Sequence, residues 1–129
     1  MSFYTEITQA EVNIATKDQG TGIRAQFNFP ETLELFKGHF PSRPILPGVA
    51  QIEMARFALE TFFEKKVSIK KIKKTKFSNL IRPGTPVLLD IQIVSVEPGD
   101  NGHDLITTRV TVHSDEKVAG KLNLILVTD

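Results

Sequence analysis

One long apolar segment in the middle of the chain constrains the fold more than any other feature. From Val49 to about Glu64 the residues suit a helix, and Pro47 and Gly48 just before them are suited to open one. The apolar residues lie on several sides of that helix rather than along one stripe: Val49, Ile52, Met54, Ala55, Leu59, Phe62 and Phe63. Such a helix has to be covered on most sides by other parts of the chain.

The segments around this helix have the alternation of β-strands. In 23–29, Ile23, Ala25, Phe27 and Phe29 face one way and polar residues face the other, which predicts a half-buried strand. A weaker strand is expected around Val12 and Ile14, separated from it by the turn DQGTG. Further strands are expected at 67–77, 87–94, 105–113 and 117–127, with hairpin-length turns at 98–102 and 114–116. The alternation slips near Lys70-Lys71, which predicts a β-bulge.

These elements predict an α+β fold in which a five- to six-stranded antiparallel sheet wraps around one long central helix. The 129 residues fit a single domain, 1–129, because no linker, repeat or low-complexity tract divides them. The apolar fraction of 40% and the charged fraction of 24% are ordinary for a soluble globular protein.

The composition excludes several classes of site. The chain has no cysteine, and therefore no disulfide, no thiolate nucleophile and no cysteine zinc site. Its N-terminal residues lack the basic start and apolar core of a signal peptide, and no apolar run is long enough to span a membrane. We therefore expect a cytoplasmic protein without a membrane span.

The net charge of +1 conceals a strongly basic segment, residues 65–82. This basic segment holds eight of the 16 basic residues and no acidic one, so the rest of the chain carries 8 − 15 = −7. One interpretation is an anionic partner, and the other is a solvated strand whose lysines protect a sheet edge. Nucleic-acid binding ranks lowest, because the segment lacks interleaved aromatic residues beyond Phe77.

Residues 35–53 carry the candidate chemistry. His39 lies in a segment stiffened by several prolines, and a fixed imidazole suits the work of a general base. Gly48 stands at the expected helix N-terminus, where free backbone N–H groups can hold a carbonyl oxygen that becomes negative. Glu53 is the first ionisable residue of this helix, and partial burial would favour the protonated form that an acid needs.

Each of these residues also has a structural interpretation. A lone histidine in a proline-rich loop is more often structural than catalytic. Glu53, Arg56, Glu60 and Glu64 follow spacings of 3, 4 and 4, which periodicity alone favours as a charged, solvent-facing helix stripe. The other two histidines, His103 and His113, are expected at the surface near turns or strand ends.

The stretch LFKGHFPSRPILPGVAQIE, residues 35–53, resembles the signature of the β-hydroxyacyl-acyl carrier protein dehydratases. The GHFP block, Pro44-Ile45, Pro47-Gly48-Val49 and the acidic Glu53 match at the right spacing. The downstream KFSNLIRPGTPVLLDIQI and the turn at 115–119 also resemble the family, so the resemblance covers roughly residues 23–128.

This resemblance implies a hotdog fold and a dimer whose two sheets join, with active sites at the interface. By position it makes His39 the catalytic base, Glu53 the acidic partner and the Gly48 amide the donor to the thioester carbonyl. It also implies that Phe36, Phe40 and Val49 bind the acyl substrate and that no metal or cofactor is needed. The expected partners are an acyl carrier protein and a second hotdog subunit, identical in a homodimer or related in a heterodimer.

Several positions depart from the family pattern. Gln51 stands where the family has an aliphatic residue, and Arg56 could pair with Glu53 and hold it ionised. The N-terminal motif P-H-R-x-P-F of the family is absent from residues 1–30. These departures favour a specialised pathway, such as polyene-type lipid synthesis, over housekeeping fatty acid synthesis.

Two other functions fit the same fold. The chain could be a non-catalytic subunit of a dehydratase heterodimer, although it retains both His39 and Glu53. It could also be a hotdog acyl thioesterase, in which a helix carboxylate acts on water and the GHFP histidine would be unexpected.

Overall fold

The computed structural model describes residues 7, 11–29, 46, 48–82 and 84–129. In chain order the described elements are β1 (Glu11–Lys17), a short 3-10 turn (Asp18–Gly20), β2 (Gly22–Asn28), α2 (Gly48–Phe63), β3 (Val67–Phe77), β4 (Val87–Pro98), a second 3-10 turn (Asp100–Gly102), β5 (Asp104–Ser114) and β6 (Lys117–Thr128). This arrangement confirms the expected α+β architecture of one long helix against an antiparallel sheet.

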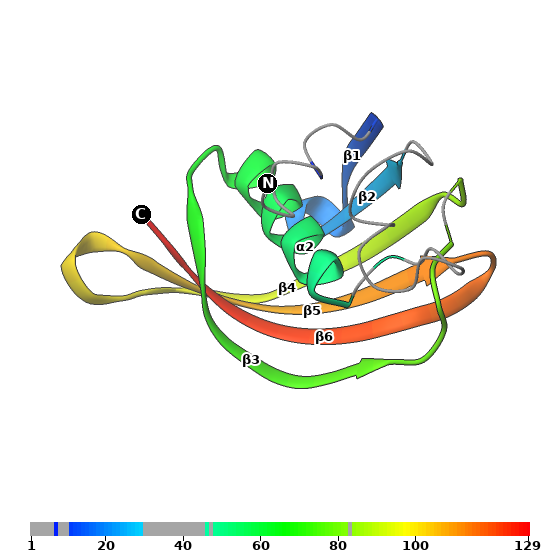
Figure 1. Ribbon diagram of the computed structural model, residues 1–129. Coiled ribbons are helices and arrows are strands. Elements are labelled where there is room, and N and C mark those ends of the chain that lie inside the picture. Colours follow the sequence, from blue (N-terminus) through cyan, green and yellow to red (C-terminus); the bar gives the residue numbers. More distant parts are fainter. Residues whose placement is uncertain (1–6, 8–10, 30–45, 47, 83) are drawn as a thin grey trace.

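The six strands form one sheet in the order β1-β2-β4-β5-β6-β3, and every neighbouring pair is antiparallel. The sheet curves, and α2 lies across its concave face (Figure 1). β3 follows the helix in the chain but joins the far edge beside β6, so the helix crosses the face between β2 and β3.

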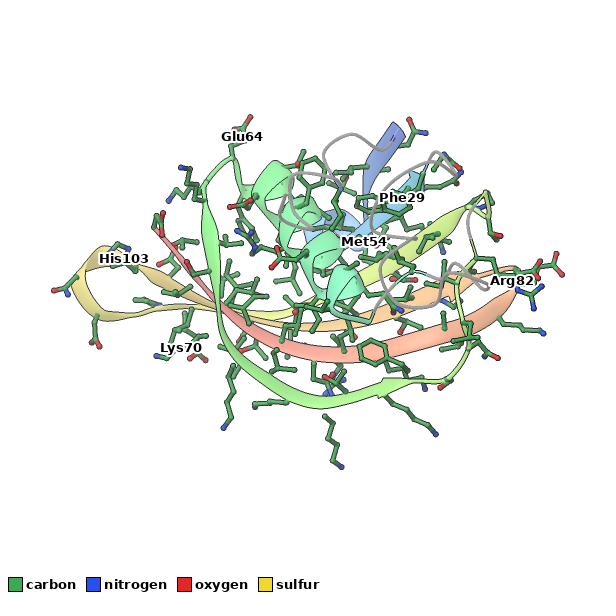
Figure 2. The ribbon with its side chains drawn as sticks, viewed as in Figure 1. Phe29, Met54, Glu64, Lys70, Arg82 and His103 are labelled. Atoms are coloured by element: carbon green, nitrogen blue, oxygen red, sulfur yellow. The ribbon has the colours of Figure 1, made fainter. Side chains whose placement is uncertain are left out.

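The core lies between α2 and the concave face, and alternation along the strands supplies it. The predicted inward residues of β2, namely Ile23, Ala25 and Phe27, are all fully buried. The helix contributes Ala50, Met54, Ala55, Ala58 and Leu59, and Figure 2 shows Met54 in the interior between helix and sheet. Three of these five residues are alanines, whose small side chains let the helix backbone lie close to the sheet.

β3 pairs with β6 in an irregular register, as the slipped alternation predicts. Its register against β6 shifts between Ile69 and Lys71 and again between Ile72 and Thr75. Most of its residues are exposed, because it is an edge strand with β6 as its one described neighbour. All eight basic side chains of the basic segment are exposed, which agrees with the edge-protection interpretation and leaves them accessible to a partner.

The hairpin between β5 and β6 is a two-residue turn at Asp115 and Glu116. Both residues have left-handed backbone angles, with φ of 55° and 60°, as a tight hairpin turn of this type requires. Aspartate tolerates this conformation, but the second position normally holds glycine, so Glu116 carries local strain there. Across the described residues, no helix has the length and apolar character to cross a membrane.

Candidate active site at the start of helix α2

Helix α2 begins at Gly48, one of the predicted site residues. A Cβ atom added there would lie 2.7 Å and 2.8 Å from ring carbons of Phe77, at the end of β3. Only glycine lets this ring pack so closely on the helix N-terminus, and Leu46 N–H donates to Ile81 O at 2.8 Å to fix the approach to the helix. The first backbone N–H groups of a helix have no partner within it, so this end is a donor site for a developing oxyanion.

Two apolar side chains next to this helix start remain uncovered. Val49 is 47% exposed and Phe77 is 46% exposed. Both side chains lie where the helix start meets the edge strand β3, so a small apolar area faces solvent there.

Glu53 lies on α2 in an ion-pair network with Arg56. The Arg56 Nε donates to Glu53 Oε2 at 2.8 Å, and the two side chains are 24% and 25% exposed. Arg56 Nη1 also lies 3.8 Å from Glu60 Oε2 and donates to Val67 O at 3.4 Å. Glu60 Oε2 in turn accepts from Val67 N at 2.9 Å, so the network joins the helix to the first residue of β3.

The predicted stripe is therefore only partly a solvent face. The i,i+3 and i,i+4 pairing is confirmed, but Glu60 is 12% exposed, and Glu64 is the one member of the stripe that is exposed. The expectation of a wholly solvent-facing stripe was wrong because β3 folds back beside the helix and covers its central residues. Arg56 thus holds Glu53 from one side while the other side of the carboxylate remains accessible.

Gly48 and Glu53 lie on different sides of the helix. Glu53 is five positions after Gly48, which corresponds to roughly 7.5 Å of rise and about 140° of rotation around the helix axis. A single ligand beside the Gly48 amide is thus poorly placed to reach Glu53 of the same chain.

Gln51 is a buried polar residue that the sequence marks only as a departure from the family. It is 2% exposed, and its Oε1 has no hydrogen-bond partner among the described residues. This oxygen lies 2.6 Å from where a Cβ would be at Gly120 of β6, so the glycine makes room for the amide. The amide therefore lies between the helix start and β6, close to Phe77 and its cross-strand neighbour Gly120.

The other predicted site residues have different outcomes. His39, Phe36 and Phe40 lie outside the described residues, so their roles stay predictions. His103 and His113 are partly exposed, and Figure 2 shows His103 at the end of the sheet opposite Arg82. The described residues include no group of three or more His, Asp or Glu side chains that could hold a metal ion.

Comparison with known proteins places the chain in a family. The model of the ApeI-like family, described as ApeI dehydratase, matches residues 15–117. The FabZ 3-hydroxyacyl-acyl-carrier-protein dehydratase of Clostridium acetobutylicum is 30% identical over 102 residues, covering 73% of this chain and 70% of that protein. The FabZ enzyme of Levilactobacillus brevis is 30% identical over 115 residues, covering 84% and 74%.

Solved structures agree with this placement. The dehydratase heterocomplex ApeI:P from Xenorhabdus doucetiae superposes with a TM-score of 0.64 at 27% identity, covering 90% of this chain and 97% of that one. The thioesterase HI1161 from Haemophilus influenzae has a TM-score of 0.65 at 15% identity, covering 99% and 82%, and shares the fold alone. The fold and the family match together define a hotdog protein of the dehydratase type. The chain belongs to the ApeI-like dehydratase family.

Proposed function

We propose that this protein dehydrates β-hydroxyacyl thioesters, carried on acyl carrier protein, to trans-2-enoyl thioesters. The observation that carries this function is the helix start itself. Gly48 opens α2 with backbone N–H groups that have no acceptor within the helix, and the partly exposed carboxylate of Glu53 follows in the same helix, in a chain of the ApeI-like dehydratase family.

The reaction divides among three groups. His39 removes the proton from the α-carbon, and the resulting charge moves onto the thioester oxygen, where the Gly48 amide stabilises it. The electrons then form the double bond between the α- and β-carbons as the bond from the β-carbon to the hydroxyl oxygen breaks. Glu53 protonates the departing hydroxyl, so that water leaves. The acyl chain binds against Phe36, Phe40 and Val49.

The site is shared between two subunits in this proposal. Gly48 and Glu53 diverge by about 140° around the helix, which favours an arrangement in which Glu53 of one subunit completes the site of the other. The exposed edge of β3 and the uncovered side chains of Val49 and Phe77 offer the surface for a second hotdog subunit. That subunit is a second copy of this chain or a related chain, and the ApeI:P protein of Xenorhabdus doucetiae is itself a dehydratase heterocomplex.

The basic segment supplies a docking surface for the carrier protein. Its eight exposed cations create a positive field that attracts an acidic partner and speeds the encounter. The departures at Gln51 and Arg56 favour a specialised pathway, such as polyene-type lipid synthesis, over housekeeping fatty acid synthesis.

One incubation separates the proposed function from its alternatives. The purified protein is given a β-hydroxyacyl thioester, and mass spectrometry follows loss of one water while a thiol reagent follows thiol release. Loss of water without thiol release supports the dehydratase. Thiol release would make the protein a thioesterase. If neither change occurs, the proposal that this chain is catalytic by itself is contradicted. Activity that appears only after a related hotdog subunit is added would instead indicate a non-catalytic subunit of a heterodimer.

A further inference from the structure

A second concave site lies at one end of the sheet, apart from the start of α2. It is a pocket of about 270 Å³ between the segment that follows β3 and the hairpin that joins β5 to β6. Its polar lining comprises two cations, three neutral side chains and one carboxylate: Arg82, Lys117, Asn79, Thr85, Ser114 and Asp115. Figure 2 shows Arg82 at this end of the sheet.

Backbone hydrogen bonds hold one wall of this pocket against β6. Ser78 N and Asn79 N both donate to Ala119 O, at 2.8 Å and 3.4 Å, and the Asn79 side-chain amide donates to Val118 O at 2.7 Å. A chain segment tied at three points to one strand loses little further freedom when a ligand binds, so the wall is preorganised.

The hairpin side is fixed in a similar way. The Ser114 hydroxyl donates to Pro86 O at 3.4 Å, and the strained two-residue turn at Asp115 and Glu116 sets Lys117 directly across from Ser114. Residues kept in sparsely populated backbone angles often lie at binding sites, where the surrounding structure maintains them.

The charge of the pocket favours an anion. Arg82 and Lys117 form no ion pair with any residue in the described part of the chain, and together they outnumber the single carboxylate of Asp115. A guanidinium fork and an ammonium group beside a hydroxyl are the donors that bind phosphate in proteins. A divalent cation would find only one carboxylate among these lining residues, so the chemistry of the lining favours phosphate.

The pocket is connected to the helix start by the same pair of strands. Phe77 packs on Gly48 and pairs with Gly120 of β6, and Lys117 lies three residues earlier in β6, roughly 10 Å away along an extended strand. Ile81, the neighbour of Arg82, accepts the hydrogen bond that fixes Leu46 before the helix. The pocket and the helix start therefore lie near each other along β3 and β6, so one extended ligand can reach from the pocket to the Gly48 amide.

We infer that this pocket binds the phosphate at the outer end of the substrate's phosphopantetheine arm, with Arg82 and Lys117 as its two cations. The inference rests on the proposed function for the identity of the arm. The contact adds affinity for the arm and fixes how deep the thioester reaches, but takes no part in the bond changes.

The test compares two thioesters that differ only in the phosphate, a 4′-phosphopantetheine thioester and the pantetheine thioester with the same acyl group. In Arg82→Gln we expect the KM for the phosphorylated thioester to rise about tenfold, the loss of about 1.4 kcal/mol. The KM for the pantetheine thioester and both kcat values should stay unchanged. Lys117→Gln should act in the same direction, whereas Lys121→Gln, an exposed cation of β6 outside the pocket, is the matched control. Equal effects on both thioesters, or none on either, would overturn the inference.

Direct binding separates this inference from the proposed function. Calorimetry with 4′-phosphopantetheine and with pantetheine, neither carrying an acyl group, needs no turnover. Tighter binding of the phosphorylated compound, lost in Arg82→Gln, supports the pocket even if the protein has no dehydratase activity. Turnover of a thioester together with equal binding of the two compounds refutes the pocket and leaves the function intact. A thioester bound to acyl carrier protein serves as a third substrate. Its KM, compared with that of the free 4′-phosphopantetheine thioester, shows whether the protein prefers an arm attached to a carrier protein.

Discussion

Substituting Arg56 by Gln removes the cation that holds Glu53, and its effect on stability follows from the geometry. The Arg56 Nε donates to Glu53 Oε2 at 2.8 Å, a charge-assisted hydrogen bond of a kind that contributes about 1.5–3 kcal/mol when fully buried. Both side chains are about one quarter exposed, so solvent screening reduces this to about 1 kcal/mol. The further contacts of Arg56 with Glu60 and Val67 O bring the loss for Arg56→Gln to about 2 kcal/mol.

A double-mutant cycle isolates the pair itself. Urea unfolding of the wild type, Arg56→Gln, Glu53→Gln and the double variant, at one fixed protomer concentration, yields the four free energies of unfolding. We expect a coupling free energy of about 1 kcal/mol between the two side chains. Lys121→Gln, on an exposed face of β6, should change the free energy of unfolding by less than about 0.5 kcal/mol.

Activity provides a second measurement on the same variants. The hydrogen bond from Arg56 orients the carboxyl of the proposed acid Glu53, so we expect the kcat of Arg56→Gln to fall together with its stability. A coupling free energy below about 0.3 kcal/mol, or a kcat of Arg56→Gln equal to that of the wild type, would refute this reasoning.

Three other substitutions test the surroundings of the helix. Gln51→Met removes a buried oxygen that has no partner in the described part of the chain and should raise the free energy of unfolding, measured in urea, by about 1 kcal/mol; a decrease would mean that the amide is hydrogen-bonded. Glu64→Gly relieves a φ of 55° just after α2 and should stabilise the protein by about 0.5–1 kcal/mol, read as a higher Tm; an unchanged or lower Tm would contradict this strain. Gly48→Ala places a Cβ 2.7 Å from the Phe77 ring and should lower kcat about 10- to 100-fold. Adding Phe77→Leu should recover part of that activity, and a Gly48→Ala variant with wild-type kcat would exclude a role for the helix start.

Local patterns were sufficient to predict the elements of the fold. The alternation in 23–29 predicted β2 and its buried residues Ile23, Ala25 and Phe27, because one face of a strand on a core has to be apolar. The slip near Lys70 predicted the bulged register of β3. These features depend on residues that are close to one another in the sequence, so one sequence is enough to predict them.

Contacts between distant segments could not be predicted in this way. Nothing in the spacing of the stripe shows that Val67 of β3 hydrogen-bonds with Glu60 and covers the centre of the helix. Likewise, the packing of Phe77 on Gly48 and the fit of Gln51 against Gly120 arise only when β3 and β6 lie side by side. The phosphate pocket draws on two turns about thirty residues apart, and the sequence marked it only through the basic Arg82.

Hydration of a trans-2-enoyl thioester by the purified protein tests the central claim most directly. The reverse reaction consumes the conjugated double bond, so loss of its absorbance reports the rate without a coupling enzyme. We expect the wild type to catalyse it and His39→Ala to lower kcat by about 10²- to 10⁴-fold with an unchanged Tm. Glu53→Gln should also lose activity, and a one-to-one mixture of the His39→Ala and Glu53→Gln proteins should recover part of it through mixed dimers. Wild-type rates in His39→Ala would contradict the proposed mechanism.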